Sequence, residues 1–195
     1  MKPLLYLASG AALAVVAIAL FATLLAPAAS EGSYPARYLE ALEAHAGVPV
    51  EDAHFDPFVQ FVTHMSTPDW RDYFDRVYAD TLHFSDTLTV LNSNTVLGEY
   101  YGRLHAAGAQ TSVRVISRQI SGNDGYLLWE MQSDFKPLGT PRRSHTIGVT
   151  HLRFDAAGRV ILHQDFWDAA QGFYQHLPLM GTAIRSVRDS LQPEA

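Results

Sequence analysis

The sequence has no cysteine among its 195 residues, which excludes disulfides, thiolate nucleophiles and cysteine-ligated zinc. It also has no run of lysine or arginine, and its formal net charge is −6 at pH 7. Because binding to a phosphate backbone needs a basic surface, we expect no nucleic-acid partner. The Gly-x-Ser-x-Gly nucleophile motif and a glycine-rich phosphate-binding loop are missing as well. The sequence therefore supports neither a serine hydrolase nor phosphate binding by such a loop.

Charged residues are absent from the stretch between Leu4 and Ala26. An apolar run of this length can cross a bilayer as a helix, and Lys2 before it would stay on the cytoplasmic side. The small residues in Ala26-Pro27-Ala28 also suit a signal peptidase. We therefore expect residues 1–30 to be a signal anchor or a signal peptide. The domain would then be membrane-anchored outside the cytoplasm, or periplasmic or secreted after cleavage.

The remaining sequence has the composition of one globular domain, since apolar residues make up 48% of the chain and charged residues 17%. Residues 31–53 are rich in alanine, glycine, proline and glutamate, and predict a linker with a short helix at Ala36–Ala46. The compact domain is expected over residues 54–176. Residues 177–195 predict an amphipathic C-terminal helix with Ile184 on its apolar face.

The first half of the domain has helical periodicity. Apolar residues from Phe55 to Val62 recur at helical spacing, and Asn94–Ala107 repeats the pattern before Gly108, which suits a helix C-cap. Between them, Thr67 followed by Pro68 predicts the N-cap and first position of another helix. A short strand over residues 78–86, followed by a loop, is expected before the third helix.

The second half changes to the period-two pattern of β-strands. The segment Gly122-Asn-Asp-Gly125 is a strong hairpin signal, and Asp155-Ala-Ala-Gly158 predicts a second hairpin turn. Helices followed by long meandering strands indicate an α+β fold, with the helices on one side of a bent sheet. The four strands are expected at Ser112–Ile120, Tyr126–Phe135, Arg143–Phe154 and Arg159–Trp167.

Three short segments resemble proteins of the SnoaL-like, nuclear transport factor 2-like superfamily. These are Tyr78-Ala-Asp80 with His83–Asp86, the helix end Tyr100–Leu104, and the strand ending Asp165-Phe-Trp-Asp168. The resemblance implies a cone-shaped curved antiparallel sheet wrapped around N-terminal helices, with an apolar pocket inside. The superfamily includes ketosteroid isomerases, polyketide cyclases, limonene-epoxide hydrolases, dehydratases and non-catalytic binding modules.

The last predicted strand carries the first catalytic candidates. Alternation along it places His163, Asp165 and Trp167 on one face. The resemblance implies that an aspartate at the position of Asp165 accepts or donates a proton, as in SnoaL-like cyclases and epoxide hydrolases. A carboxylate in an apolar cone suits that work, and His163 on the same face could orient it or share its proton.

Ligand contacts are expected from residues that line the cone. Trp129 and Met131 share one face of their strand, and the other expected contacts are Trp167, Tyr78, Phe84 and His151. Epoxide hydrolases of the superfamily place an arginine and an aspartate where Trp129 to Gln132 stand here, so epoxide hydrolysis is not expected. Isomerases of the superfamily need a tyrosine and a second acid, and the sequence offers Tyr73, Tyr78, Tyr100, Tyr101 and Asp86.

Histidines on the two last strands also raise a metal hypothesis. His145 and His151 could approach His163 and Asp165 across the hairpin, depending on the register. Imidazole and carboxylate are zinc and iron ligands, but the sequence has no His-x-x-x-His pair on a helix. We therefore expect neither a metal nor another cofactor.

Two functional hypotheses follow. In the first, the cone binds a small hydrophobic molecule and Asp165 with His163 performs acid–base chemistry of the isomerase, cyclase or lyase type. In the second, the domain is a non-catalytic module whose open sheet face forms a homodimer or another interaction. A cavity above roughly 300 Å³ that reaches Asp165 favours ligand binding, whereas a cone filled by Trp129, Trp167 and Phe84 favours the second.

Overall fold

The computed structural model of the protein describes residues 34–192. The predicted anchor or signal peptide at residues 1–30 lies outside this range. Within the described part, no helix combines the length and the apolar character needed to cross a bilayer. The chain divides into two compact units after Leu39, and the second unit begins at Glu40.

The secondary structure has the predicted α+β order. The helices are α2 (Tyr34–Ala44), α3 (Phe55–His64), α4 (Trp70–Phe74), α5 (Asn94–Ala106), α6 (Ala169–Gly172) and α7 (Met180–Leu191), with 3-10 turns η1 (Asp52–His54), η2 (Pro137–Gly139) and η3 (Tyr174–His176). The strands are β1 (Tyr78–Ser85), β2 (Val90–Ser93), β3 (Gln110–Ser121), β4 (Asp124–Phe135), β5 (Arg142–Phe154) and β6 (Val160–Trp167).

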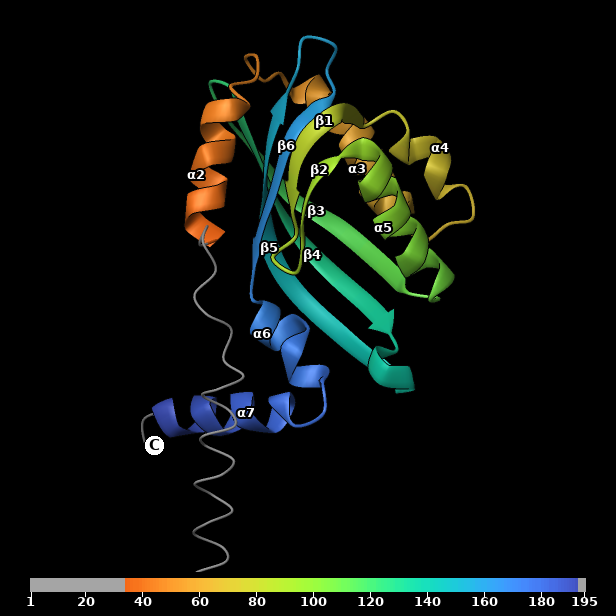
Figure 1. The fold of residues 1–195 in the computed structure, drawn as a ribbon, viewed down its shortest axis with the longest axis vertical. Coiled ribbons are helices and arrows are strands. Elements are labelled where there is room, and N and C mark those ends of the chain that lie inside the picture. The colour runs from red at the N-terminus through yellow and green to blue at the C-terminus, as the bar shows by residue number, and fades with distance from the viewer. Residues whose placement is uncertain (1–33, 193–195) are drawn as a thin grey trace, which may run out of the picture. The chain divides into compact units, whose positions relative to one another are not determined.

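The strands form one curved six-stranded sheet in the order β2-β1-β6-β5-β4-β3. Strands β3 to β6 make the predicted antiparallel meander, whereas β1 pairs with β6 in parallel. The sheet is therefore mixed, which corrects the expectation of a purely antiparallel one. Figure 1 shows α3, α4 and α5 gathered on one side of this sheet.

Two local expectations were wrong. The loop expected after residue 86 contains β2, a four-residue strand too short to show clear alternation, which pairs with β1. Helix α4 begins at Trp70 rather than beside Thr67. The hydroxyl of Thr67 donates to the backbone oxygen of His64 over 2.7 Å, so it closes the end of α3 and does not cap α4.

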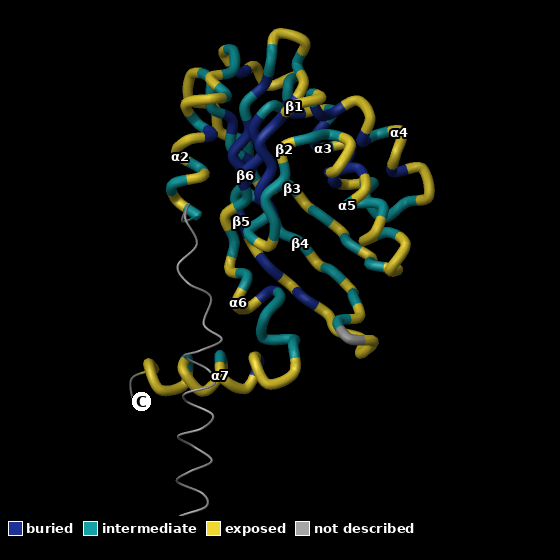
Figure 2. Tube along the Cα trace, in the orientation of Figure 1, coloured by how far each residue is buried: buried dark blue, intermediate teal, exposed yellow. Residues whose placement is uncertain are grey.

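The core consists mainly of aromatic rings between α3, α5 and the sheet. Phe55 and Phe61 of α3 and Tyr78 of β1 are fully buried, and Phe74 of α4 is almost so. Complete burial of each such side chain stabilises the fold by roughly 1.5–3 kcal/mol. Figure 2 shows the buried segments concentrated along β1 and β6, while α7 is largely exposed. This core packs β1 and β6 against helices α3 and α5.

The segment predicted as a linker is attached to the sheet at its end. The backbone amide of Val48 donates to Phe154 over 2.9 Å, and that of Val50 donates to Gly122 over 2.9 Å. The Arg153 guanidinium donates to the backbone oxygens of Leu42 and His45. These bonds satisfy carbonyl groups at the end of α2, as helix termini require.

Candidate functional site

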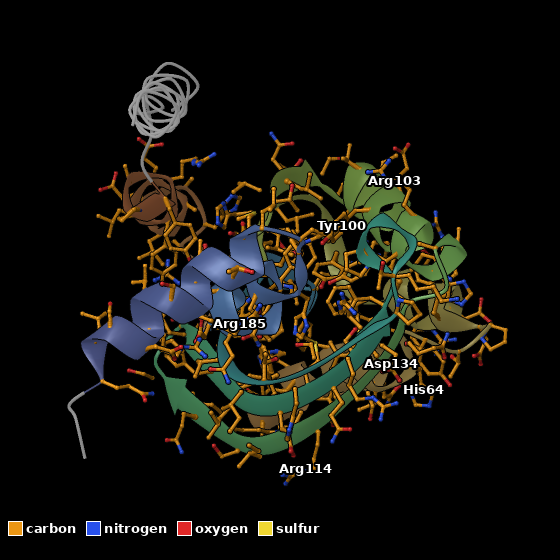
Figure 3. All side chains as sticks on the ribbon, turned by 90° about the horizontal axis from the view of Figure 1, so that it is seen from below. His64, Tyr100, Arg103, Arg114, Asp134 and Arg185 are labelled. Carbon is orange, nitrogen blue, oxygen red and sulfur yellow. The ribbon has the colours of Figure 1, made fainter. Side chains whose placement is uncertain are left out.

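A cavity of about 230 Å³ lies between the sheet and helices α3 and α5. Its walls are mostly apolar, with polar groups from the loop after β1 and from strands β3 to β6. In Figure 3, Tyr100 lies on the side of α5 that faces the sheet, whereas Arg114 lies on the outer side of the sheet. The apolar walls include Phe58, Val62, Met65, Leu104, Val113, Val115, Leu127, Trp129, Met131 and Trp167.

The carboxylate of Asp165 is held at this cavity by Thr150. The register of β5 and β6 places Thr150 opposite Asp165, and the Thr150 hydroxyl donates to Oδ1 of Asp165 over 2.5 Å. The same hydroxyl accepts a bond of 2.8 Å from the Trp129 indole nitrogen. One threonine therefore fixes both a candidate acid–base group and an aromatic wall of the cavity.

His163 connects Asp165 to a buried phenol. Its Nε2 lies 3.0 Å from Oδ1 of Asp165, and its Nδ1 lies 2.9 Å from the hydroxyl of Tyr78. The tautomer with its proton on Nε2 donates to Asp165 and leaves Nδ1 to accept from the Tyr78 hydroxyl. Burial raises the pKa of Tyr78 well above its ordinary value of 10.0, which keeps the phenol protonated as the donor.

The imidazole ring of His163 is immobilised by aromatic contacts. Phe84 and Phe58 meet it edge-on, with ring centroids 4.7 Å and 5.2 Å away, and the ring of Tyr78 is parallel to it. His163 is only 3% exposed. The orientation of Asp165 is therefore set by a buried, closely packed partner.

A second carboxyl group, Asp86, reaches the cavity from the loop after β1. Burial raises the pKa of Asp86 above its ordinary value of 3.8, although hydrogen bonds to it oppose the effect. Its Oδ2 accepts a bond of 2.5 Å from the Tyr100 hydroxyl, and its Oδ1 accepts from the amides of Leu88 and Thr89. The Trp167 indole nitrogen donates to the Asp86 backbone oxygen over 2.8 Å. This second acid is thus fixed next to the strand that carries Asp165.

Five of the residues expected at the site line the cavity: His163, Asp165, Trp129, Met131 and Trp167. Tyr78 and Phe84 do not line it, and contact His163 instead. Both come from β1, which the parallel pairing places beside β6. Tyr78 and Phe84 therefore position His163, which lines the cavity.

His151 is a correction, because it points to the other side of the sheet. Its Nε2 lies 2.8 Å from Oδ1 of Asp124, and its ring stacks on Tyr126 at 4.6 Å. Strand alternation gives the reason, since the neighbouring residue Thr150 is the one that faces Asp165. His145 is bonded to Glu130, and no cluster of three potential metal ligands exists among residues 34–192.

Sequence reasoning missed Thr150 and the pairing of Asp86 with Tyr100. A polar residue at a strand position that faces an apolar interior is a signal for the first, because such groups need hydrogen-bond partners. The second depends on the contact between a loop and a helix. Nothing in the local pattern of either segment indicates it.

Solved structures with the same fold support this architecture. A protein from Shewanella denitrificans OS-217, described as SnoaL-like and assigned to the polyketide cyclases, is 14% identical with a TM-score of 0.54; the match covers 70% of this chain and 99% of that protein. A protein from Jannaschia sp. CCS1 with the same description is 16% identical with a TM-score of 0.51; the match covers 62% of this chain and 88% of that protein.

An LEH-like epoxide hydrolase from M. tuberculosis is 15% identical with a TM-score of 0.52 over 62% of this chain and 86% of its own. No protein-family model and no curated protein matches the sequence. Likeness at these identities shows the fold alone. The chain thus has the SnoaL-like, nuclear transport factor 2-like fold that its Asp165-Phe-Trp-Asp168 ending predicts.

Proposed function

We propose that the cavity binds a small, mainly apolar molecule with a carbonyl group and that Asp165, assisted by His163, transfers a proton on it. The observation that carries this proposal is the hydrogen-bonded series from Tyr78 through His163 to Asp165, which ends at the wall of an apolar cavity. Titratable groups with shared hydrogen bonds in such a cavity are candidates for acid–base work.

The arrangement suits removal of a proton from carbon next to a carbonyl group. Asp165 would accept the proton as a carboxylate, while the protonated ring nitrogen of His163 stabilises its charge and fixes its direction. Asp86, whose pKa is raised by burial, is a candidate to donate a hydrogen bond to the carbonyl oxygen as charge develops there. Return of the proton to another carbon would give an isomerase, and loss of a leaving group would give a lyase.

The cavity volume limits the ligand. About 230 Å³ is below the roughly 300 Å³ at which common small-molecule sites begin. The cavity nevertheless reaches Asp165, and Trp129 and Trp167 line it without filling it. These features favour ligand binding over a cone filled by its own aromatic side chains, provided that the ligand is slender.

The test is exchange of the α-hydrogens of dodecan-2-one in D₂O, followed by NMR. We expect the wild-type protein to accelerate exchange and Asp165→Asn to abolish the acceleration while retaining binding. Asp80→Asn changes an exposed aspartate of β1 and serves as the matched control. A wild-type protein that binds the ketone but exchanges its hydrogens no faster than Asp165→Asn would contradict proton transfer.

We further propose that the sheet's outer face forms a homodimer. Cross-strand neighbours Leu128, Val149 and Phe166 make an apolar row on this face, and Ile147 beside them is 62% exposed. Arg114 and Glu130 next to the row form an ion pair within the chain, so they place no unpaired charge beside it. Sedimentation equilibrium should give a dimer for the wild type and a monomer for Ile147→Asp. A monomeric wild type at every concentration contradicts this proposal.

We also propose that residues 1–30 anchor the chain in a membrane or export it. The support is the uncharged run between Leu4 and Ala26. Fractionation of cells that express the full chain, followed by N-terminal sequencing, distinguishes the two outcomes. An intact N-terminus in the membrane fraction indicates an anchor, whereas a new N-terminus near Ala28 indicates cleavage. Full-length protein in the cytosol contradicts both.

A further inference from the structure

A row of hydroxyl side chains crosses the cavity-facing side of the sheet. Thr111 of β3 is the cross-strand neighbour of Ser133 in β4, and Ser133 is the neighbour of Ser144 in β5. All three line the cavity. Cavity-facing positions nearby on the same strands carry apolar residues such as Val113 and Met131. The hydroxyl row is therefore a polar band on an otherwise apolar wall.

The hydroxyls of this row differ in their hydrogen bonding. Thr111 Oγ1 and Ser133 Oγ lie 2.9 Å apart, and the Ser66 hydroxyl bonds to the backbone of Thr111. Ser144 is only 4% exposed, and its Oγ has no hydrogen-bond partner in the described part of the chain. Buried hydroxyl groups almost always have a partner. Ser144 thus presents an unused donor and acceptor to the cavity.

The hydroxyl row lies far from Asp165 along the sheet. Thr150, which holds Asp165, is six positions after Ser144 on β5. At about 3.3 Å per residue, this separation is roughly 20 Å along the strand. The residues that line the cavity therefore extend along β5 from Thr150 to Ser144. An unbranched chain can span such a distance.

The lining also limits the charge of the ligand. Among the described residues that line the cavity there is no lysine and no arginine. A buried carboxylate or phosphate without a cationic partner would lose its hydration without compensation. His105 also lines the cavity, but Ser144 itself is a hydroxyl, which can donate to and accept from a neutral oxygen without a charged partner.

We propose that Ser144 binds a second, neutral oxygen of the ligand, which is an unbranched chain with a ketone at one end and a hydroxyl at the other. The inference rests on the proposed function, in which the ketone lies at Asp165. It adds the identity of the opposite end and the linear shape of the molecule between them.

The experiment compares dodecan-2-one with 12-hydroxydodecan-2-one by isothermal titration calorimetry. The hydroxyl-ended probe should bind the wild-type protein roughly 3- to 10-fold more tightly, since a neutral hydrogen bond contributes modestly. Ser144→Ala should abolish this preference and leave the affinity for dodecan-2-one unchanged. Ser112→Ala, on the exposed side of β3, should keep the preference. If Ser144→Ala does not fold, Ser144→Cys removes most of the hydrogen bond at nearly the same shape.

The outcomes separate this inference from the proposed function. Equal affinities of the two probes for the wild type, or a preference that persists in Ser144→Ala, overturn the role of Ser144. If α-hydrogen exchange still requires Asp165 in that case, the proposed function stands without it. If neither probe binds, both proposals fail together.

Discussion

Thr150 and Asp165 face each other across β5 and β6, and the threonine hydroxyl donates to the aspartate carboxylate over 2.5 Å. The same oxygen accepts the indole proton of Trp129. Thr150 therefore joins the candidate acid–base group to the wall of the cavity. His163, on the other side of Asp165, completes its fixed environment.

We expect Thr150→Val to destabilise the protein by about 1–3 kcal/mol, because it leaves the buried Trp129 indole without its hydrogen-bond acceptor and removes one of the hydrogen bonds to the Asp165 carboxylate. Valine has nearly the same shape, so the change tests the hydroxyl rather than the packing. Guanidinium unfolding measures the effect. Thr81→Val on the exposed part of β1 is the control and should change stability little. An unchanged free energy of unfolding in Thr150→Val would show that Thr150 does not hold these groups.

Asp86 should make stability fall as pH rises. Its pKa in the folded protein is raised above the ordinary 3.8, so the folded state binds more protons than the unfolded state between these two values. The contribution of neutral Asp86 is fully present below about 3.8 and is lost as pH rises through the folded pKa. Asp86→Asn should remove this part of the pH dependence, measured as the difference between the two thermal melting profiles. If the melting temperatures of the two proteins change with pH in parallel, the raised pKa of Asp86 is contradicted.

His151 and His163 should behave differently when replaced by alanine. His151 is 1% exposed and bonded to Asp124 on the outer side of the sheet. We expect His151→Ala to cost about 2–4 kcal/mol of stability while ketone affinity at low temperature stays unchanged. His163→Ala should lose stability and α-hydrogen exchange together. If folded His151→Ala loses ketone binding, His151 contributes to the ligand site despite its position on the outer side of the sheet.

Thr87 adopts a strained conformation beside Asp86. Its φ angle is +70°, in the left-handed region that β-branched residues avoid, and its hydroxyl has no partner among the described residues. We expect Thr87→Gly to stabilise the protein by about 1 kcal/mol and to weaken ketone binding, because the loop that positions Asp86 loses rigidity. Chemical unfolding and calorimetry test the two effects. Lower stability in this variant would show that the side chain supports the loop.

The elements with strong local periodicity could be predicted from sequence. Helix α3 begins at Phe55, as its apolar spacing predicts, and the hairpin turn falls at Gly122. Alternation along β6 correctly predicted that His163, Asp165 and Trp167 share a face. These features depend on neighbours two to four residues apart, and a single sequence contains that information.

Partners distant in sequence could not be predicted in the same way. Tyr78 and His163 are 85 positions apart and meet because β1 pairs in parallel with β6. The spacing of the β5 histidines allows them to approach Asp165, but the register places Thr150 at that position. A shift of one residue in a strand pairing exchanges the two faces of the sheet, so the choice depends on the packing of the whole core.

The sequence by itself therefore determined the α+β order, the alternation that places Asp165 beside His163, and the presence of polar residues on apolar strands. Only the tertiary structure decided which of those polar residues meet. It joined Asp165 to Thr150, brought Asp86 to Tyr100, and left the Ser144 hydroxyl at the cavity with no hydrogen-bond partner in residues 34–192. The physical reason is that side-chain direction follows from local backbone geometry, whereas strand register and loop contacts are fixed by the burial of aromatic residues from distant segments.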